Sequence, residues 1–77
     1  MQTPRLTTHA RQRCEEMGVV TKRVKRIVRE PHSNRCTRDE RWIAVRDDDP
    51  EISAVYVLGP KYPIVVTVLY RFKEYSR

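Results

Sequence analysis

The side chains in this sequence that could do chemistry are few. His9 could exchange a proton near neutral pH, while Arg13 and Arg41 could bind phosphate and stabilise its charge. Tyr70 could donate a proton beside a cation, and Lys61 could act in place of an arginine. Attack of a ribose 2′-hydroxyl on its own phosphate needs such a base, an acid and cations, and no metal ion.

Each of these residues also has an ordinary structural interpretation. His9 could hydrogen-bond a helix cap or a strand backbone, and Arg13 could form an ion pair with Glu16 or Glu30. Arg41 could be a charge that protects an edge strand, and Tyr70 could lie at the rim of the core. The sequence alone therefore leaves open whether the protein is an enzyme.

Positive charge is concentrated in the first half of the chain. The 77 residues contain 16 lysines and arginines against 10 acids, a net charge of +6, and 12 of the cations are arginine. Residues 1–38 hold ten bases and three acids (+7), and residues 39–77 hold six and seven (−1), which together give +6. A basic surface attracts polyanions, and the planar guanidinium suits phosphate. The charge therefore favours nucleic acid as a ligand over a merely solubilising role.

Most of this charge lies in one predicted helix. The cations expected to hold nucleic-acid phosphates are Lys22, Arg23, Lys25, Arg26 and Arg29, with Lys61 in a predicted turn. A solvated helix surface is the alternative. Binding to an anionic membrane is disfavoured, because the helix is short and has no Trp or Phe.

The two cysteines and two histidines do not predict a metal site. His9 and Cys14 are five residues apart, which places them about 140° apart around a helix. His32 and Cys36 lack the Gly-containing hairpin of a zinc knuckle. We therefore expect ordinary thiols, no metal and no cofactor.

The length predicts one domain, residues 1–77. No apolar run approaches the ~20 residues that span a bilayer, and residues 1–5 are not followed by the apolar stretch of a signal peptide. We therefore expect a cytoplasmic protein that does not bind membranes.

An extended arm, residues 1–6, is predicted to precede the first of two helices. This helix covers residues 9–17, with Thr7 or Thr8 as its N-cap and Gly18 as the left-handed residue that ends it. Its buried stripe is expected to contain Leu6, Ala10, Cys14 and Met17.

The second helix is predicted at residues 22–30, with Thr21 as its cap and Pro31 ending it. Its buried stripe is expected to pack beneath Val66 and Val68 of the last strand. This stripe consists of Val20, Val24, Ile27 and Val28.

Residues 32–71 show short apolar runs and period-two patterns, which predict a β-meander. The expected strands are residues 32–37, 41–46, 51–58 and 64–70, followed by a polar tail at 72–77. The nearly unbroken β-branched run of the last strand suits an interior position. The predicted fold is α+β, with residues 7–30 forming two helices on one face of an antiparallel sheet of three to four strands.

Several of these segments resemble a small, mostly uncharacterised bacterial and phage domain family grouped with the BrnT-type and RelE-type toxins. Residues 8–13 (THARQR) and 17–19 (MGV) resemble its opening motif S-x-H-A-x-x-R-x-x-x-R-G-I, with Met17 in place of an arginine. Arg41 begins the second strand, as in that family, and residues 65–70 (VVTVLY) resemble its closing V-I-T-V-Y. The resemblance covers residues 6 to 71.

The resemblance implies a RelE-like fold and, as in characterised relatives, metal-independent cleavage of RNA. It also implies RNA as a partner, including RNA on the ribosome, and inhibition by a cognate antitoxin in a bacterial or phage-encoded setting. Under this hypothesis His9, Arg13 and Arg41 are the catalytic cluster, with Tyr70 as a further proton donor. The alternative is a non-catalytic phage or plasmid accessory protein that binds nucleic acid or a host protein through its basic face. A homo-oligomer is compatible with either.

Overall fold

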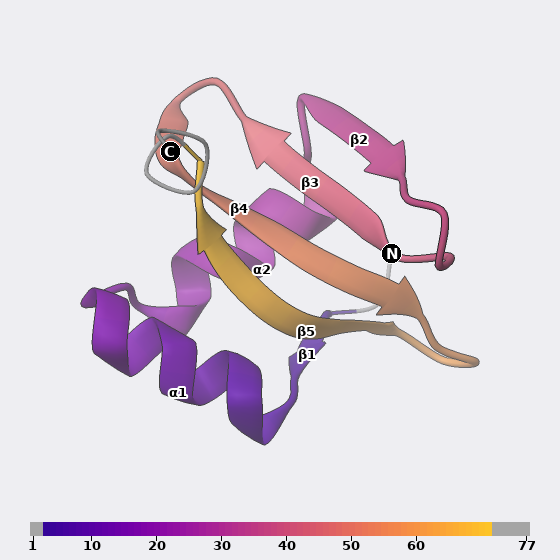
Figure 1. Ribbon diagram of the computed structural model, residues 1–77, viewed down its shortest axis with the longest axis horizontal. Helices are drawn as coiled ribbons and strands as arrows, with labels where there is room; N and C mark the ends of the chain where they lie inside the picture. The colour runs from indigo at the N-terminus through magenta and orange to yellow at the C-terminus, as the bar shows by residue number, and fades with distance from the viewer. Residues whose placement is uncertain (1–2, 72–77) are drawn as a thin grey trace.

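The computed structural model describes residues 3–71. In chain order its elements are β1 (Arg5–Leu6), α1 (Thr8–Met17), α2 (Thr21–Arg29), β2 (Ser33–Cys36), β3 (Trp42–Arg46), β4 (Asp49–Leu58) and β5 (Pro63–Tyr70). The strands form one five-stranded sheet in the order β1-β5-β4-β3-β2, and the two helices pack against it (Figure 1). The predicted α+β class is confirmed.

The prediction of an antiparallel sheet of three to four strands is wrong in strand number and in one pairing. β2 to β5 form the expected antiparallel meander. Within the predicted arm, however, Arg5 and Leu6 form a strand that pairs in parallel with β5, opposite Ile64 and Val65. A two-residue strand is too short for a period-two pattern to reveal it. The sheet is therefore mixed.

α1 begins at Thr8, one residue before the predicted start, and ends at Met17 as predicted. The Thr7 hydroxyl oxygen accepts a hydrogen bond from the Ala10 backbone nitrogen at 3.1 Å, which makes Thr7 the N-cap. Gly18 adopts the left-handed conformation at φ 69°, and the Val19 nitrogen donates to the Cys14 carbonyl at 2.8 Å. These bonds use backbone groups that the end of a helix otherwise leaves without partners.

The second helix starts one residue earlier than the sequence pattern indicates. Thr21 is its first helical residue, and the N-cap is Val20, whose side chain makes no capping hydrogen bond. Thr21 is therefore not the cap. The helix ends at Arg29, and Pro31 follows the C-cap Glu30, because proline disfavours helix at the residue before it.

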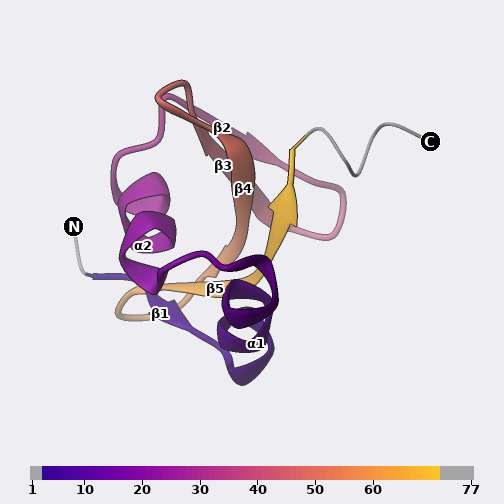
Figure 2. The ribbon, with the colours of Figure 1, turned by 90° about the vertical axis from the view of Figure 1, so that its left-hand side faces the viewer.

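The core lies between both helices and one face of the sheet (Figure 2). Val24, Ile27 and Val28 share this core with Val68, as predicted, but Val66 is not part of it. The β4–β5 register shifts so that Tyr56 pairs with Val65 and Val55 with Thr67, which leaves Val66 as an extra residue. This bulge breaks the period-two alternation, and Val65 takes the buried position. The buried core residues are Ala10, Cys14, Val24, Ile27, Val28, Ala44, Ile52, Ala54, Tyr56, Val65 and Val68.

Alternation along the strands separates this core face from a second face of the sheet. Ile43, Val45 and Ser53 lie on the second face, and neither of the two helices in residues 3–71 covers it. Within the same described range, no helix has the length and apolar character needed to cross a membrane.

Candidate nucleic-acid interface

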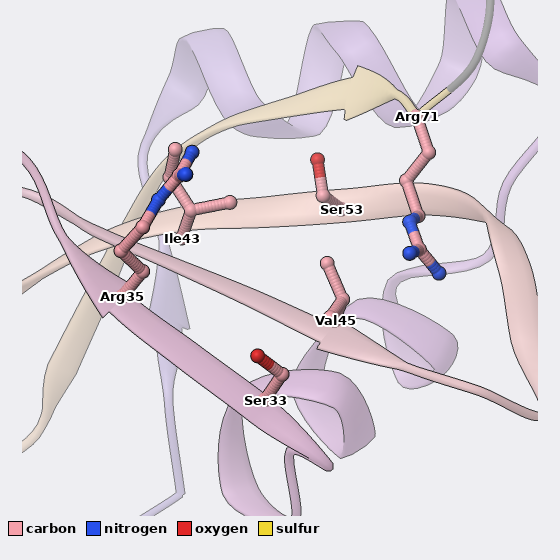
Figure 3. A pocket seen from close by; sticks show the side chains of 6 residues that line it. All are labelled: Ser33, Arg35, Ile43, Val45, Ser53 and Arg71. Carbon is pink, nitrogen blue, oxygen red and sulfur yellow. The ribbon is translucent and has the colours of Figure 1, made fainter.

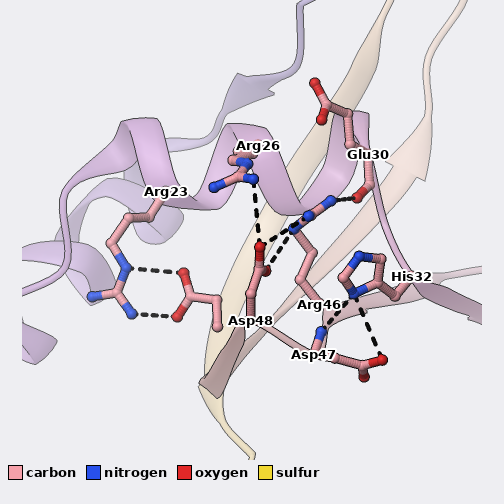
Figure 4. Close-up of polar contacts among 8 residues, drawn as sticks. Arg23, Arg26, Glu30, His32, Arg46, Asp47 and Asp48 are labelled. Atoms are coloured by element: carbon pink, nitrogen blue, oxygen red, sulfur yellow. Dashed lines mark hydrogen bonds and ion pairs between the residues drawn. The ribbon is translucent and has the colours of Figure 1, made fainter.

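Two of the five α2 cations form ion pairs with acids from the β3–β4 turn and the start of β4 (Figure 4). The Arg23 Nε donates to Asp49 Oδ2 at 3.0 Å, and its Nη2 also bonds Asp49. The same Nη2 lies 3.5 Å from Glu51 Oε1. The Arg26 Nη2 lies 3.4 Å from Asp48 Oδ2. Much of the charge of Arg23 and Arg26 is therefore neutralised within the molecule.

A third arginine, Arg46 of β3, binds the same acidic segment. Arg46 has only 8% of its surface exposed, and its Nε and Nη2 donate to Asp48 at 2.8 and 3.0 Å. Its Nη1 donates to the Glu30 backbone carbonyl, which ties the end of α2 to the β3–β4 turn. The hydrogen bonds from Arg46 lower the pKa of Asp48 to about 2, so this carboxylate is ionised at neutral pH. Beside it, the Asp47 backbone nitrogen donates to His32 Nδ1 at 2.8 Å.

The other three α2 cations remain available to a ligand. Lys22, Lys25 and Arg29 form no ion pair with another residue of the range 3–71. Their spacings of three and four residues place them on one stripe of the helix, about 10 Å long. They line a shallow hollow of ≈ 400 Å³, and its other lining residues are Val20, Arg23, Arg26 and Glu30. We call Lys22, Lys25 and Arg29 the α2 stripe.

His9 and Arg13 lie together on α1, along the edge of β5. The His9 Nε2 is 3.3 Å from Thr67 Oγ1, and the imidazole is exposed. The Arg13 Nε donates to the Val68 backbone carbonyl at 3.1 Å, and its Nη1 lies 3.8 Å from Glu16 Oε1. The structure thus brings together two of the four predicted catalytic residues, and Arg13 has a structural role there.

Arg41, the third predicted catalytic residue, does not lie beside this pair. Arg41 precedes β3, and its Nε lies 3.4 Å from Asp39 Oδ2. β4 separates β3 from β5, so two strand spacings, ~10 Å, lie between Arg41 and the strand beside His9. Tyr70 is the half-buried last residue of β5, where it pairs with Ile52 of β4.

Lys61 lies apart from the α2 stripe, in the turn between β4 and β5. The Arg5 guanidinium carbon lies 5.0 Å from the centre of the Tyr62 ring in the same turn. This is a cation–π contact, and no signal in the sequence predicts it. Lys61 and Arg5 therefore form a separate, smaller basic area.

Sequence reasoning missed the acidic partners of α2. Residues 47–50 lie between two expected strands and no partner is predicted for them, whereas Asp48, Asp49 and Glu51 bind α2 cations across the fold. The available signal was charge, because residues 47–51 carry −4 and the α2 segment carries +5. Blocks of opposite charge predict a contact between the two segments, but only the fold shows which of the cations take part in it.

The cysteines and acids do not form a metal centre in the part of the chain that the structure describes. No group of three or more His, Cys, Asp or Glu residues in that part could hold a metal ion. Cys14 and Cys36 are both free thiols, one buried and one exposed. Burial raises the pKa of the Cys14 thiol, so the reactive thiolate is disfavoured there.

Comparison with known proteins does not assign this chain to a group. No family model, no curated protein and no solved structure matches it. The α2 stripe and the His9–Arg13 pair are therefore interpreted from their own geometry and charge.

Proposed function

We propose that the protein binds RNA through the phosphate backbone, with the α2 stripe as its principal contact. The observation that carries this proposal is the division of the α2 cations into two sets. Arg23 and Arg26 form ion pairs with the acidic segment, whereas Lys22, Lys25 and Arg29 form no ion pair with another described residue. A cation without an internal partner can exchange its counterion for a phosphate, which is the main source of such affinity.

The composition of the α2 stripe favours binding that does not depend on sequence. Two of its three members are lysines, whose ammonium groups are mobile point charges on flexible stems. Contacts to phosphate fix position and carry no direct information about the bases. The protein is therefore expected to bind different single-stranded sequences with similar affinity.

The order of elements supports a more specific part of the proposal, a RelE-like fold of the BrnT and RelE toxin type. Two helices come first and an antiparallel meander follows, closing on the strand that contains Thr67 and Tyr70. This is the order that the resemblance implies. A protein of this type would act on RNA in the cytoplasm, with an antitoxin or host protein as partner.

Charge reversal on α2 tests RNA binding directly. We expect Lys22→Glu/Lys25→Glu/Arg29→Glu to weaken binding of a fluorescein-labelled 12-nucleotide RNA by at least tenfold at low salt, measured by anisotropy. The matched control is Arg11→Glu/Arg38→Glu/Lys61→Glu, which changes the net charge equally at exposed positions outside the stripe. Circular dichroism would establish that both variants are folded. Equal loss in the two variants, or no loss in the first, would overturn the assignment to α2.

RNA cleavage is a second candidate function, favoured by the His9–Arg13 pair. An exposed imidazole can take or give a proton near neutral pH, and a guanidinium one helical turn away can stabilise charge on phosphate. Because Arg41 lies two strands away from β5, the reaction would depend on His9 and not on Arg41.

Growth arrest in an expression host separates the two candidates. If the protein cleaves RNA, the wild type should arrest growth and degrade total RNA, His9→Ala should abolish both effects, and Arg41→Ala should retain them. Loss of one good charge stabiliser or proton-transfer group costs ~10²–10³ in rate, which suffices to silence a toxin. An intact RNA pool with the wild type, or an active His9→Ala variant, would leave the non-catalytic RNA binder as the function.

A further inference from the structure

β2 forms an open edge of the sheet. It is the last strand in the order β1-β5-β4-β3-β2, and all of its residues, Ser33–Cys36, are exposed. Within residues 3–71 no further strand pairs with its outer side. The backbone N–H and C=O groups on that side can therefore form hydrogen bonds with another chain.

The pairing of β2 with β3 determines which backbone groups point outward. The Thr37 nitrogen donates to the Arg41 carbonyl at 2.6 Å, just beyond the end of β2. Hydrogen-bonded pairs alternate along an antiparallel ladder, so the backbone groups of Arg35 also face β3. The backbone groups of Asn34 and Cys36 therefore face the open edge.

A hollow borders this edge on the second face of the sheet. Its volume is ≈ 250 Å³, and Arg35 of β2 lies there beside Ile43 of β3 (Figure 3). Its other lining residues are Ser33, Val45, Ser53 and Arg71. Arg35 forms no ion pair with another residue of the described range, and neither does Arg38 in the hairpin that follows β2. This side of the edge therefore suits an acidic side chain.

Another hollow borders the same edge on the side of the core. It has a volume of ≈ 480 Å³, and Cys36, Trp42 and Leu58 line it. Its other lining residues are Asp39, Glu40 and Val57. Trp42 packs against the core cluster and pairs with Cys36, so the two side chains share a face. Because Leu58 has 68% of its surface exposed, this side of the edge suits an apolar side chain.

We propose that β2 binds an extended segment of a partner protein, in which acidic and apolar side chains alternate. The segment adds an antiparallel strand to the sheet, and the outward backbone groups of Asn34 and Cys36 bind it. Its residue opposite Arg35 has its side chain on the second face, where a carboxylate meets the guanidinium. Its neighbours have their side chains on the side of the core, near Trp42 and Leu58.

Charge disfavours a second copy of this chain as the added strand. If two β2 strands paired antiparallel over their full length, the two Arg35 side chains would lie opposite each other, and like charges there destabilise a strand pair. The proposal uses a different surface from the α2 stripe and does not rest on RNA binding.

An eight-residue peptide in which valine and glutamate alternate is the probe. Its binding to the whole protein should slow amide hydrogen exchange at Asn34 and Cys36 and leave the exchange at Arg35 unchanged. N-methylation of the valines, whose amides face β2 in this arrangement, should abolish binding. N-methylation of the glutamates, whose amides face solvent, should change the affinity less than threefold.

Variants of β2 test the same contacts from the side of the protein. Cys36→Pro removes an outward N–H, which an edge strand tolerates, and should weaken peptide binding by roughly tenfold relative to Cys36→Ala. Arg35→Glu should also weaken binding by roughly tenfold, because it replaces attraction with repulsion. Arg11→Glu, an equal change of charge at an exposed position of α1, should change the affinity less than twofold. Circular dichroism would establish that each variant is folded.

Several outcomes would overturn the proposal. These are no binding of the unmodified peptide, equal binding after N-methylation of the valines, equal binding of a peptide with lysine in place of glutamate, and equal affinities of Arg35→Glu and wild type. Dimers that Cys36→Pro dissociates would instead make this edge an interface between copies of the chain. RNA that protects the Asn34 and Cys36 amides would make it an RNA site. Loss of RNA binding in the α2 stripe variant concerns the proposed function alone, because that variant retains β2.

Discussion

Arginine side chains in this protein have two distinct uses, and their surroundings decide which. The guanidinium groups of Arg46 and Arg13 make internal contacts, since they donate hydrogen bonds to the backbone carbonyls of Glu30 and Val68. Lys25 and Arg29, by contrast, make no ion pair within residues 3–71. A count of basic residues therefore overstates the charge that is available to a ligand.

Removing the Arg13 guanidinium should destabilise the protein. Arg13→Ala removes the hydrogen bond to the Val68 carbonyl, and we expect a loss of about 1 kcal/mol in the free energy of unfolding. Arg11→Ala, an exposed residue of the same helix, should change stability by less than ~0.5 kcal/mol. Urea unfolding followed by circular dichroism measures both. If the two variants were equally stable, the bond to β5 would contribute nothing.

Asp48 should make stability depend on pH in the acid range. Its pKa is lowered from the ordinary value of 3.8 to about 2 by the hydrogen bonds from Arg46. The ionised form is thus favoured in the folded state, so its contribution is complete above pH ~4 and is lost as pH falls through about 2. Melting temperature should fall over this window, and Asp48→Asn should flatten the fall. Asp47→Asn is the matched control, and an equal flattening there would contradict the assignment.

α1 protects one edge of the sheet, and the sequence of β2 protects the other. The Thr7 nitrogen donates to the Val65 carbonyl at 3.0 Å, and its hydroxyl to the Val66 carbonyl at 3.4 Å. With the bond from Arg13, these contacts occupy outer carbonyls of β5 that would otherwise pair with another chain. β2 is short and exposed, and Arg35 on it discourages edge-to-edge association.

The end of α1 offers a test at the level of the element. A Cβ atom added to Gly18 would meet nothing within 4 Å, so Gly18→Ala changes only the backbone energy. Because the residue has a φ of 69°, we expect Ala to cost about 1–2 kcal/mol and Gly18→Asn clearly less. Thermal unfolding of the two variants measures the difference. Equal stability of Ala and wild type would mean that α1 can end in another conformation.

Elements with strong local signals could be predicted from the sequence, and those fixed by distant contacts could not. The threonine cap, Gly18 and the apolar spacing of α2 define both helices locally. The parallel pairing of Leu6 with Val65 has no local signal, because its partner lies 59 residues away. The bulge at Val66 is also invisible in a run of β-branched residues that suits either face.

The candidate site shows the same limit. Sequence reasoning placed the five cations on one helix, α2, and it placed His9 and Arg13 together on the other. It could not separate the ion-paired cations from the others, because that depends on how the β3–β4 turn meets α2. The position of Arg41 relative to His9 depends on the strand order of the sheet, which the periodicity of the sequence does not predict.

At the scale of the whole molecule, the net charge of +6 determines the long-range attraction to RNA. The α2 stripe determines how many RNA phosphates are contacted. Three phosphates neutralised on single-stranded RNA should give a slope of about −2 for log K against log salt. The stripe variant should bring the slope close to zero. Anisotropy titrations over a tenfold range of salt measure it. A slope near −4 would mean that Arg23 and Arg26 leave their acids to bind RNA.

The parallel pairing of β1 with β5 constrains how the protein can form during its synthesis. Leu6 leaves the ribosome early, but its partner Val65 emerges only after almost the entire meander has been translated. Closing so long a loop is slow, so β1 and the β5 side of the core must wait for the final strand. A chain that ends before residue 63 would therefore lack the strand that covers the apolar stripe of α1 and pairs with the outer edge of β4.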